Sequence, residues 1–262
     1  MNNKIHSINT FRCSTNIDEP KAQYWDSQWS IKPRPRFKSK FFIDTHNIQR
    51  LLKRYVSPGV SFLEIGCSPG KHLAWVGAKL KANVAGLDYS EQGIEITKWI
   101  FKELGVCGDI RCEDIFLTTF DPGSFDVVFS SGVIEHYNNP IDIVNCHIQL
   151  LKPGGKAIIA IPNYGGIYGK LQYRVNPENL AVHNLNIMSC NALIALSPSP
   201  LVSGVRAYPY GRFSPFLVDL ANVLPNILAN VILYTMNLFG HMQVKDIECL
   251  CPMLVLEITR KK

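Results

Sequence analysis

The strongest constraint on the fold is a regular alternation of short apolar runs and amphipathic stretches between residues 43 and 161. The runs predict strands at 60–65, 83–87, 108–112, 125–130 and 156–161, and the stretches predict helices at 43–55, 71–81, 91–104 and 139–151. Apolar strands that are separated by helices are buried on both faces of a sheet. The pattern therefore predicts an α/β domain with a mainly parallel sheet.

The order is less regular after residue 162. Residues 163–186 are rich in Gly, Tyr and Asn and predict a long functional loop. A helix is expected at 189–196, followed by strands at 201–208 and 253–260. A hairpin of these two strands, one of them antiparallel, would complete a doubly wound sheet of seven strands.

Length and composition favour one globular domain. The chain has 262 residues, of which 47% are hydrophobic and 18% are charged. We expect an N-terminal extension or lid at 1–41 and a domain at 42–262, with a helical insertion at about 210–245. The net charge of +6 permits an anionic or membrane partner without requiring nucleic acid.

The start of the chain and its cysteines bear on its compartment and its metal content. The opening MNNKIHSINT contains no apolar segment, so we expect no cleaved secretory signal. The eight cysteines show no paired CxxC spacing typical of a zinc site. These features predict a cytoplasmic protein with reduced thiols and no metal site.

A turn rich in small residues, FLEIGCSPG at 62–70, follows the first predicted strand. Gly66 and Gly70 would let a ligand approach the backbone closely, because glycine has no side chain. Glu64 would repel a phosphate but would suit a ligand that carries a cationic amino group. The turn therefore predicts a ligand site that is not a phosphate-binding loop.

Acidic residues also follow the next two predicted strands. Asp88 could accept hydrogen bonds from both hydroxyls of a ribose. Asp114 could bind the amino group of an adenine, with Ile115 against the ring. In open α/β sheets, ligands bind where strands end at their carboxyl side. Glu64, Asp88 and Asp114 thus lie at the ends of three successive predicted strands, and together they indicate a nucleoside-containing ligand.

Five segments together resemble the class I S-adenosylmethionine-dependent methyltransferases. They are LEIGCSPGKH, GLDYS, CEDI, FDVVFSSGVIEHYNNP and LLKPGGKAIIAIPN, and they cover residues 62–163. The chain is most similar to the small-molecule group that includes the ubiquinone-biosynthesis O-methyltransferases. One departure is Ser68, which stands where the first motif of the family usually has a glycine.

The resemblance implies a Rossmann-like fold with S-adenosylmethionine as cofactor. The cofactor-binding residues it implies are Glu64, Gly66, Cys67, Ser68 and Gly70 in the first turn, Asp88, Tyr89, Asp114 and Ile115 after the next two strands, the Ser130–Ser131 backbone, and Arg36 or Lys38 for the methionine carboxylate.

Two histidines are candidates for the proton acceptor in methyl transfer. His136 follows the fourth predicted strand, next to Glu135, and His183 lies in the long predicted loop. In the alternative interpretation, Glu135 and His136 only shape the loop. The aromatic residues of the same loop could form one wall of an acceptor pocket or pack the loop down; they are Tyr164, Tyr168 and Tyr173.

Motifs that are missing narrow the acceptor class. The sequence reads SSGV where methyltransferases of nucleobases or glutamine usually carry an NPPY-type motif. We expect a small-molecule, natural-product, lipid-linked or sugar-linked acceptor, methylated on a hydroxyl, and no nucleic-acid partner. The alternatives are an RNA methyltransferase and a non-catalytic scaffold that binds S-adenosylmethionine.

Two further segments have unusual composition. The run KPRPRFKSK at 32–40 could bind an anionic group or remain a solvated arm. Residues 216–240 are strongly apolar, and their polar residues fall at helical spacing and predict one polar face; these are Asp219, Asn222, Asn226, Asn230 and Asn237. This segment is expected to form a lid or a homodimer contact, with peripheral contact to the inner face of a membrane as the alternative.

Overall fold

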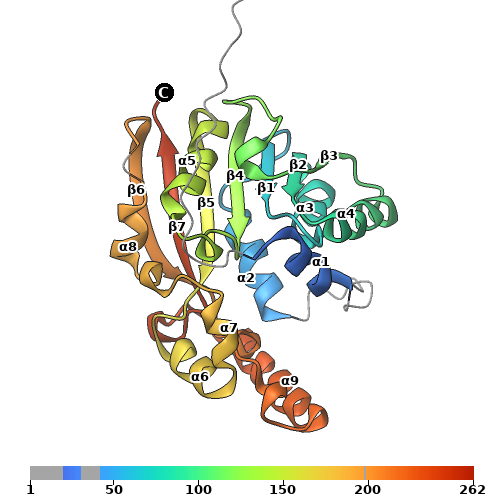
Figure 1. Cartoon of the computed structure of the whole chain (residues 1–262), viewed down its shortest axis with the longest axis vertical. Coiled ribbons are helices and arrows are strands. Elements are labelled where there is room, and N and C mark those ends of the chain that lie inside the picture. The colour runs from blue at the N-terminus through green and yellow to red at the C-terminus, as the bar shows by residue number, and fades with distance from the viewer. Residues whose placement is uncertain (1–19, 31–41, 198) are drawn as a thin grey trace, which may run out of the picture.

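A computed structural model describes residues 20–30, 42–197 and 199–262. Its centre is a seven-stranded sheet in the order β3-β2-β1-β4-β5-β7-β6 (Figure 1). The strands are β1 (Ser61–Ile65), β2 (Asn83–Asp88), β3 (Gly108–Cys112), β4 (Phe125–Ser131), β5 (Leu151–Pro162), β6 (Val202–Tyr210) and β7 (Met253–Arg260). The first five pair in parallel, while β7 is antiparallel to both β5 and β6. The predicted fold class is confirmed.

Helices cover both faces of the sheet (Figure 1). One face packs against α2 (Ile43–Leu52), α3 (Lys71–Trp75) and α4 (Glu91–Leu104), and the other against α5 (Pro140–Leu150) and α8 (Cys190–Ala195). Successive strand residues alternate between the two cores, because side chains of a strand point to opposite faces. In β1, Phe62 joins the first core, and Leu63 and Ile65 join the second.

The segment predicted as a long loop is instead partly helical. It contains α6 (Ile167–Val175) and α7 (Pro177–Ala181). Tyr168 and Gln172 are buried on one side of α6, and Asn176 caps α7 by accepting a hydrogen bond from the backbone N–H of Asn179. The loop prediction was wrong because these helices are short and gain their stability from tertiary packing.

The apolar segment before β7 forms a shorter helix than predicted. The helix α9 (Asn226–Met242) begins directly after Pro225, and Asp219 and Asn222 lie before it, at the N-cap and the last residue of a short 3-10 helix. Asn237 is fully buried, while Ile227 is 82% exposed and Met242 is 78% exposed. The predicted single polar face is therefore wrong, because tertiary contacts turn one asparagine inward and leave apolar side chains in solvent.

None of the helices in the described ranges is long and apolar enough to cross a membrane. Figure 1 shows α6, α7 and α9 together beyond the carboxyl ends of the parallel strands. Apolar side chains of α9 are exposed. The homodimer contact and the membrane contact expected for this segment stay predictions.

The buried amide of Asn237 gives a test of how α9 is held. Its Oδ1 accepts a hydrogen bond of 2.9 Å from the backbone N–H of Ile43, at the start of α2. We expect Asn237→Ala to lower the free energy of unfolding by about 1–3 kcal/mol, because the buried N–H loses its acceptor. Urea unfolding would measure the change. Asn230→Ala is the matched control at an exposed position of α9, and an equal loss in both variants would contradict this account.

Candidate active site

A crevice opens at the carboxyl ends of β1, β2 and β4, and its volume is about 210 Å3. The strand order reverses between β1 and β4, which is the place where open α/β sheets bind ligands. Residues from three strand ends and from α1 (Ala22–Ser30) line this cofactor crevice: Gly66, Ser68, Asp88, Tyr89, Ser131, Gly132, Val133, His136, Tyr137, Trp25 and Trp29.

The turn after β1 is held close to the neighbouring strands. Gly66 has a φ of +68°, and a Cβ atom there would lie 2.5 Å from Cγ2 of Val133. The backbone N–H groups of Gly66 and Cys67 both donate to the carbonyl oxygen of Leu87 in β2. Glycine is required at position 66 because of both the positive φ and the close approach.

Asp88 ends β2 at the floor of the crevice. Its carboxylate accepts hydrogen bonds from the backbone N–H groups of Ser68, at 3.1 Å, and Ser90, at 2.9 Å. Burial raises the pKa of Asp88, and these backbone donors act in the opposite direction. A carboxylate held in this way has a fixed position in which its remaining lone pairs can accept bonds from two adjacent hydroxyls.

Glu64 lies behind the turn and supplies a test of the predicted cofactor. Its Oε2 is buried and has no hydrogen-bond partner among the described residues. Burial raises the pKa of Glu64 well above its ordinary value, and the nearby charge of Asp88 raises it further. A cationic group close by would stabilise this pair of acids. The residues therefore fit S-adenosylmethionine, which carries an ammonium group and a sulfonium group.

The far end of the crevice continues between Tyr89 and Asp114. Tyr89 donates its hydroxyl proton to the carbonyl of Pro20, at 2.6 Å, and Asp114 accepts a hydrogen bond from the N–H of Phe116. Side chains of this region surround a hollow of about 280 Å3. The rings of Tyr89, Phe116 and Tyr137 line it beside Asp114, and such a lining suits a flat ring.

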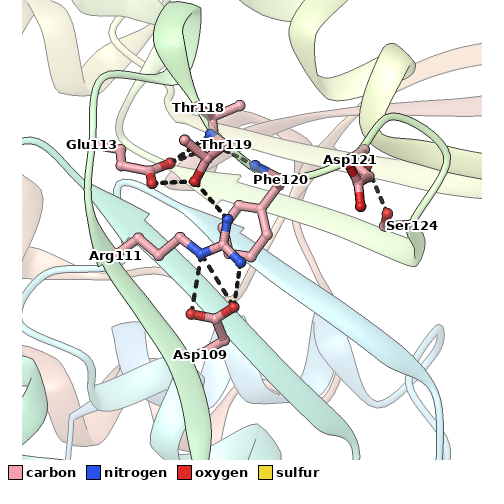
Figure 2. Close-up of polar contacts among 8 residues, drawn as sticks. All are labelled: Asp109, Arg111, Glu113, Thr118, Thr119, Phe120, Asp121 and Ser124. Carbon is pink, nitrogen blue, oxygen red and sulfur yellow. Dashed lines mark hydrogen bonds and ion pairs between the residues drawn. The ribbon is translucent and has the colours of Figure 1, made fainter.

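A polar cluster fixes the chain on either side of Asp114 (Figure 2). Arg111 donates to both carboxylate oxygens of Asp109 and to Oγ1 of Thr119. Glu113 accepts hydrogen bonds from the hydroxyls of Thr118 and Thr119. Glu113, the other acid of the CEDI segment, therefore stabilises the turn, while Asp114 lines the hollow next to the crevice.

A second and larger cleft adjoins the crevice and has a volume of about 980 Å3. The two share Trp25, Trp29, Ser131, Gly132 and His136. The walls of this acceptor cleft come from α1, α2, α6–α7 and the segment between β6 and α9. A group bound in the cleft could therefore meet a cofactor bound in the crevice at these five shared residues.

Glu135, His136 and His183 cluster where the two cavities meet. The rings of His136 and His183 have centroids 4.7 Å apart. Nδ1 of His136 lies 2.8 Å from the carbonyl of Val182, and Nδ1 of His183 lies 2.7 Å from that of Asn179. A carbonyl only accepts, so Nδ1 carries the proton in each ring and Nε2 keeps a lone pair.

This cluster could serve two chemistries. Burial, together with the charge of His183, lowers the pKa of His136 to about 4, and burial lowers the pKa of His183. Both imidazoles are therefore neutral near pH 7. One ligand atom from each of the three residues lies within 4.8 Å of the others, close enough for a divalent cation. The lone pairs can equally accept a proton from a substrate.

Comparisons with known proteins agree with this arrangement. A family model described as a methyltransferase domain matches residues 63–159. A ubiquinone biosynthesis O-methyltransferase of Xanthomonas euvesicatoria pv. vesicatoria is 28% identical over 62% of this chain and 67% of its own. One from Roseobacter denitrificans is 31% identical over 54% of this chain, and the match spans 59% of that relative.

Solved structures show the same fold. An S-adenosylmethionine-dependent methyltransferase of Thermotoga maritima, described as a possible histamine N-methyltransferase, aligns with a TM-score of 0.57 at 18% identity, over 85% of this chain and 91% of that one. The plantazolicin methyltransferase in complex with SAH aligns with a TM-score of 0.54 at 18% identity, over 94% and 92%.

Residues 63–159 form a methyltransferase domain, and the chain has the fold of S-adenosylmethionine-dependent methyltransferases. The matched domain contains the turn after β1 and the ends of β2 and β4, which form the cofactor crevice. S-adenosylmethionine is accordingly its cofactor, and the individual cofactor contacts remain predictions.

Several residues predicted for the cofactor have other surroundings in the methyltransferase. Cys67 and Ile115 are buried in the two cores, at 2% and 5% exposure. A Cβ atom on Gly70 would collide with Thr97 of α4, so this glycine permits helix packing. Arg36 and Lys38, with the whole run 32–40, lie outside the described residues.

Ser130 is also turned away from the crevice. Its Oγ bonds with Nε2 of His147 at 2.9 Å, and both residues are fully buried between β4 and α5. Its neighbour Ser131 lines the crevice instead. The backbone at this position can still contact a ligand, but the side chain cannot.

His147 predicts how the methyltransferase responds to acid. Burial lowers its pKa to about 4, whereas the unfolded chain has a histidine pKa of about 6.5. The unfolded state therefore binds a proton first as the pH falls from 6.5 to 4, and stability is lost in that window. We expect His147→Gln to reduce the slope of the free energy of unfolding against pH in this window by about 1.4 kcal/mol per pH unit. Urea unfolding at several pH values would measure it, and an unchanged slope would contradict the account.

Of the three tyrosines predicted for the acceptor pocket, only Tyr164 lines the cleft. Tyr168 is 2% exposed, stacks against Phe213 and donates its hydroxyl proton to the carbonyl of Leu250. Tyr173 is 69% exposed. The prediction was wrong for these two because the segment is helical, and residues of one helix face different directions.

The helix α1 lies in the segment predicted as an N-terminal extension or lid, but none of its aromatic residues was predicted to line the site. Trp25 and Trp29 line both the crevice and the cleft, and Trp25 packs edge-on against His136 at 5.1 Å. Asp26 anchors the helix by accepting hydrogen bonds from the hydroxyl of Ser90 and the backbone N–H of Gln92. This helix therefore covers the point where methyl transfer would occur.

Acceptor-side residues on other elements were also missed. They are Asp44, His72, Asn176, Asn179 and Asp219, all of which line the cleft. No motif connects them, because they come from α2, α3, α6–α7 and the segment before α9. Only the tertiary fold brings them together.

Proposed function

We propose that this methyltransferase transfers the methyl group of S-adenosylmethionine to a hydroxyl oxygen of a small-molecule, natural-product or lipid- or sugar-linked acceptor in the acceptor cleft. The two relatives compared above are named O-methyltransferases, which supports oxygen as the target. The observation that carries the proposal is the pair of imidazole lone pairs at the junction of the two cavities.

Methyl transfer to a hydroxyl requires two things of the protein. The bound cofactor supplies an activated methyl group, so that the protein has mainly to align the acceptor and remove its proton. The carbon–sulfur bond breaks as the carbon–oxygen bond forms, and the hydroxyl proton passes to Nε2 of His183 or His136. S-adenosylhomocysteine and a methyl ether are the products.

The remaining residues of the junction position the acceptor and exclude water. Trp25 lies over His136, and Tyr164 packs edge-on against His183 at 5.2 Å. These rings restrict the orientation of both imidazoles. A hydroxyl placed between them would have few alternatives to the line of attack on the methyl group.

The RNA alternative is disfavoured by the charge of the cleft. Its described lining contains Asp44, Glu135, Glu178 and Asp219 and neither Lys nor Arg. Nucleic-acid binding draws its affinity from cations that contact phosphates. The scaffold alternative gives no reason for two imidazoles with exposed lone pairs at the junction.

Product analysis would test the proposal. The full-length protein would be incubated with S-adenosylmethionine carrying a deuterated methyl group and with extracts of bacterial metabolites and lipids. We expect mass-labelled methyl ethers, detected by mass spectrometry and assigned by NMR. Labelled amines alone would overturn oxygen as the target, and cofactor binding without any labelled product would favour the scaffold alternative.

The same assay separates the two chemistries of the Glu135 cluster. Dialysis of the purified protein against a chelator should leave the rate unchanged if the imidazoles act as proton acceptors. A rate that is lost on dialysis and restored by a divalent cation would assign the cluster to metal binding.

A further inference from the structure

The charge of the acceptor cleft is opposite to that of the chain. The sequence has 27 Lys and Arg residues against 21 Asp and Glu residues, yet no Lys or Arg appears in the described lining of the cleft. Four carboxyl groups do line it, and burial raises the pKa of two of them, that of Glu135 to about 8 and that of Asp44 above its ordinary value, which leaves Glu178 and Asp219 as the other two acids of the lining. An acceptor with a carboxylate or phosphate inside the cleft would be repelled without a compensating cation.

One side of the cleft is aromatic. Tyr24, Trp25 and Trp29 come from α1, and Tyr164 comes from the start of the segment after β5. Tyr24 and Trp25 pack edge to face, with ring centroids 5.1 Å apart. Aromatic side chains present apolar faces together with hydrogen-bonding tips. This side therefore suits a ligand with flat C–H surfaces and polar edges.

Another part of the wall is built from amides and carboxylates. Asp219 accepts hydrogen bonds at its Oδ2 from the side-chain amides of Gln172, at 2.7 Å, Asn176, at 3.0 Å, and Asn179, at 2.7 Å. These three bonds fix α6 and α7 to the segment before α9. They also hold the carboxylate in position while its Oδ1 is not used by any of them.

Fixed carboxylate and amide groups are suited to recognise hydroxyl groups. A carboxylate accepts from a hydroxyl, and an amide can accept from one hydroxyl and donate to the next. Glu178, at the start of α7, and Asn222 add two more such groups to the cleft. A plain aromatic acceptor would make no hydrogen bonds with this wall, whereas an acceptor with several hydroxyls could bond with Oδ1 of Asp219, with Glu178 and with Asn222.

We propose that the group methylated in this cleft is a ring hydroxyl of an uncharged sugar. The inference rests on the proposed function and names its acceptor class. The C–H face of the sugar packs against Trp25 and Tyr164, while its hydroxyls bond with the Asp219 wall. The cleft, at about 980 Å3, also has room for the group to which the sugar is attached.

A matched pair of glycosides would test the proposal. The probes are neutral p-nitrophenyl hexosides and pentosides, with p-nitrophenyl β-D-glucoside and the corresponding glucuronide as the pair that differs only in a carboxylate. The full-length protein and S-adenosylmethionine labelled in the methyl group would be used. We expect label in at least one neutral glycoside, as a methyl ether on a ring carbon by NMR. The kcat/KM of the glucoside should exceed that of the glucuronide by about tenfold or more.

Variants of the cleft acids should change this preference. Glu178→Lys introduces a cation at an exposed position and is expected to reduce the preference for the glucoside over the glucuronide by about tenfold. Asp219→Asn is expected to raise the KM of neutral glycosides more than it lowers kcat. Glu103→Lys makes the same charge change on α4, away from the cleft, and should leave the preference unchanged. Calorimetry with S-adenosylhomocysteine would show that each variant still binds the cofactor product.

Binding gives a second readout that does not depend on turnover. Quenching of tryptophan fluorescence by neutral glycosides, in the presence of S-adenosylhomocysteine, would report on Trp25 and Trp29. The sugar assignment is overturned if no neutral glycoside binds or is labelled. It is also overturned if the glucuronide is labelled as efficiently as the glucoside, or if only phenols or amines are labelled. Label in a phenolic hydroxyl would leave the proposed hydroxyl transfer standing, whereas cofactor binding with no label in any acceptor would overturn both.

Discussion

The substitution Asp88→Ala is expected to weaken binding of S-adenosylmethionine and S-adenosylhomocysteine by about tenfold to a hundredfold, the range for a hydrogen bond to a charged group. The carboxylate is 7% exposed at the floor of the crevice. Two effects add, because the ligand loses its acceptor and the backbone N–H groups of Ser68 and Ser90 lose theirs. The turn after β1 would then be less well ordered before the ligand arrives.

Isothermal calorimetry would measure both affinities, and circular dichroism would show whether the variant is folded. Asp109→Ala is the matched control, since Asp109 is an exposed acid on the neighbouring strand whose carboxylate bonds with Arg111. The control should bind both ligands as the wild type does. A folded Asp88→Ala protein with unchanged affinity would refute the place assigned to the ribose hydroxyls.

Removing the imidazoles is expected to have the largest effect on turnover. His183→Ala should lower kcat by about a hundredfold to ten-thousandfold, the usual contribution of a positioned proton acceptor. Its affinity for S-adenosylhomocysteine should not change, because His183 lines the acceptor cleft and is not among the residues of the cofactor crevice. His136→Ala should lower kcat and also weaken the binding of S-adenosylhomocysteine, since His136 lines both cavities.

The double variant distinguishes two arrangements of the pair. If the imidazoles act as one unit, the double substitution lowers kcat little further than the worse single one. Rates would be measured with the acceptor identified by product analysis. His241→Ala, on α9 and outside the cleft lining, is the control. Single variants that both retain wild-type kcat would mean that the two histidines only shape the junction.

Local sequence was enough to predict the central sheet. The helix Glu91–Leu104 was predicted with its observed bounds, because Ser90 caps its first turn and Gly105 ends it in the left-handed conformation. The strand Met253–Arg260 was likewise predicted with its observed bounds. In each case the signal lies within the element itself, as a cap or as an uninterrupted apolar run.

Local sequence failed where stability comes from distant contacts. Tyr168 was predicted to line a pocket and is instead buried against Phe213, which is far along the chain. Asn237 was predicted to lie on the polar face of a lid or dimer helix and instead is buried and accepts a hydrogen bond from the backbone N–H of Ile43. Neither partner can be identified from the spacing of polar residues along one helix.

The candidate site divides in the same way. The sequence by itself determined the cofactor half, because Gly66, Asp88 and the fourth-strand motif lie at the ends of strands that each carry their own apolar pattern. Only the tertiary structure decided the acceptor half. Trp25, Asp219 and His183 come from segments that carry no shared motif, and they meet because α1, α6, α7 and the segment before α9 pack together at the carboxyl ends of the strands.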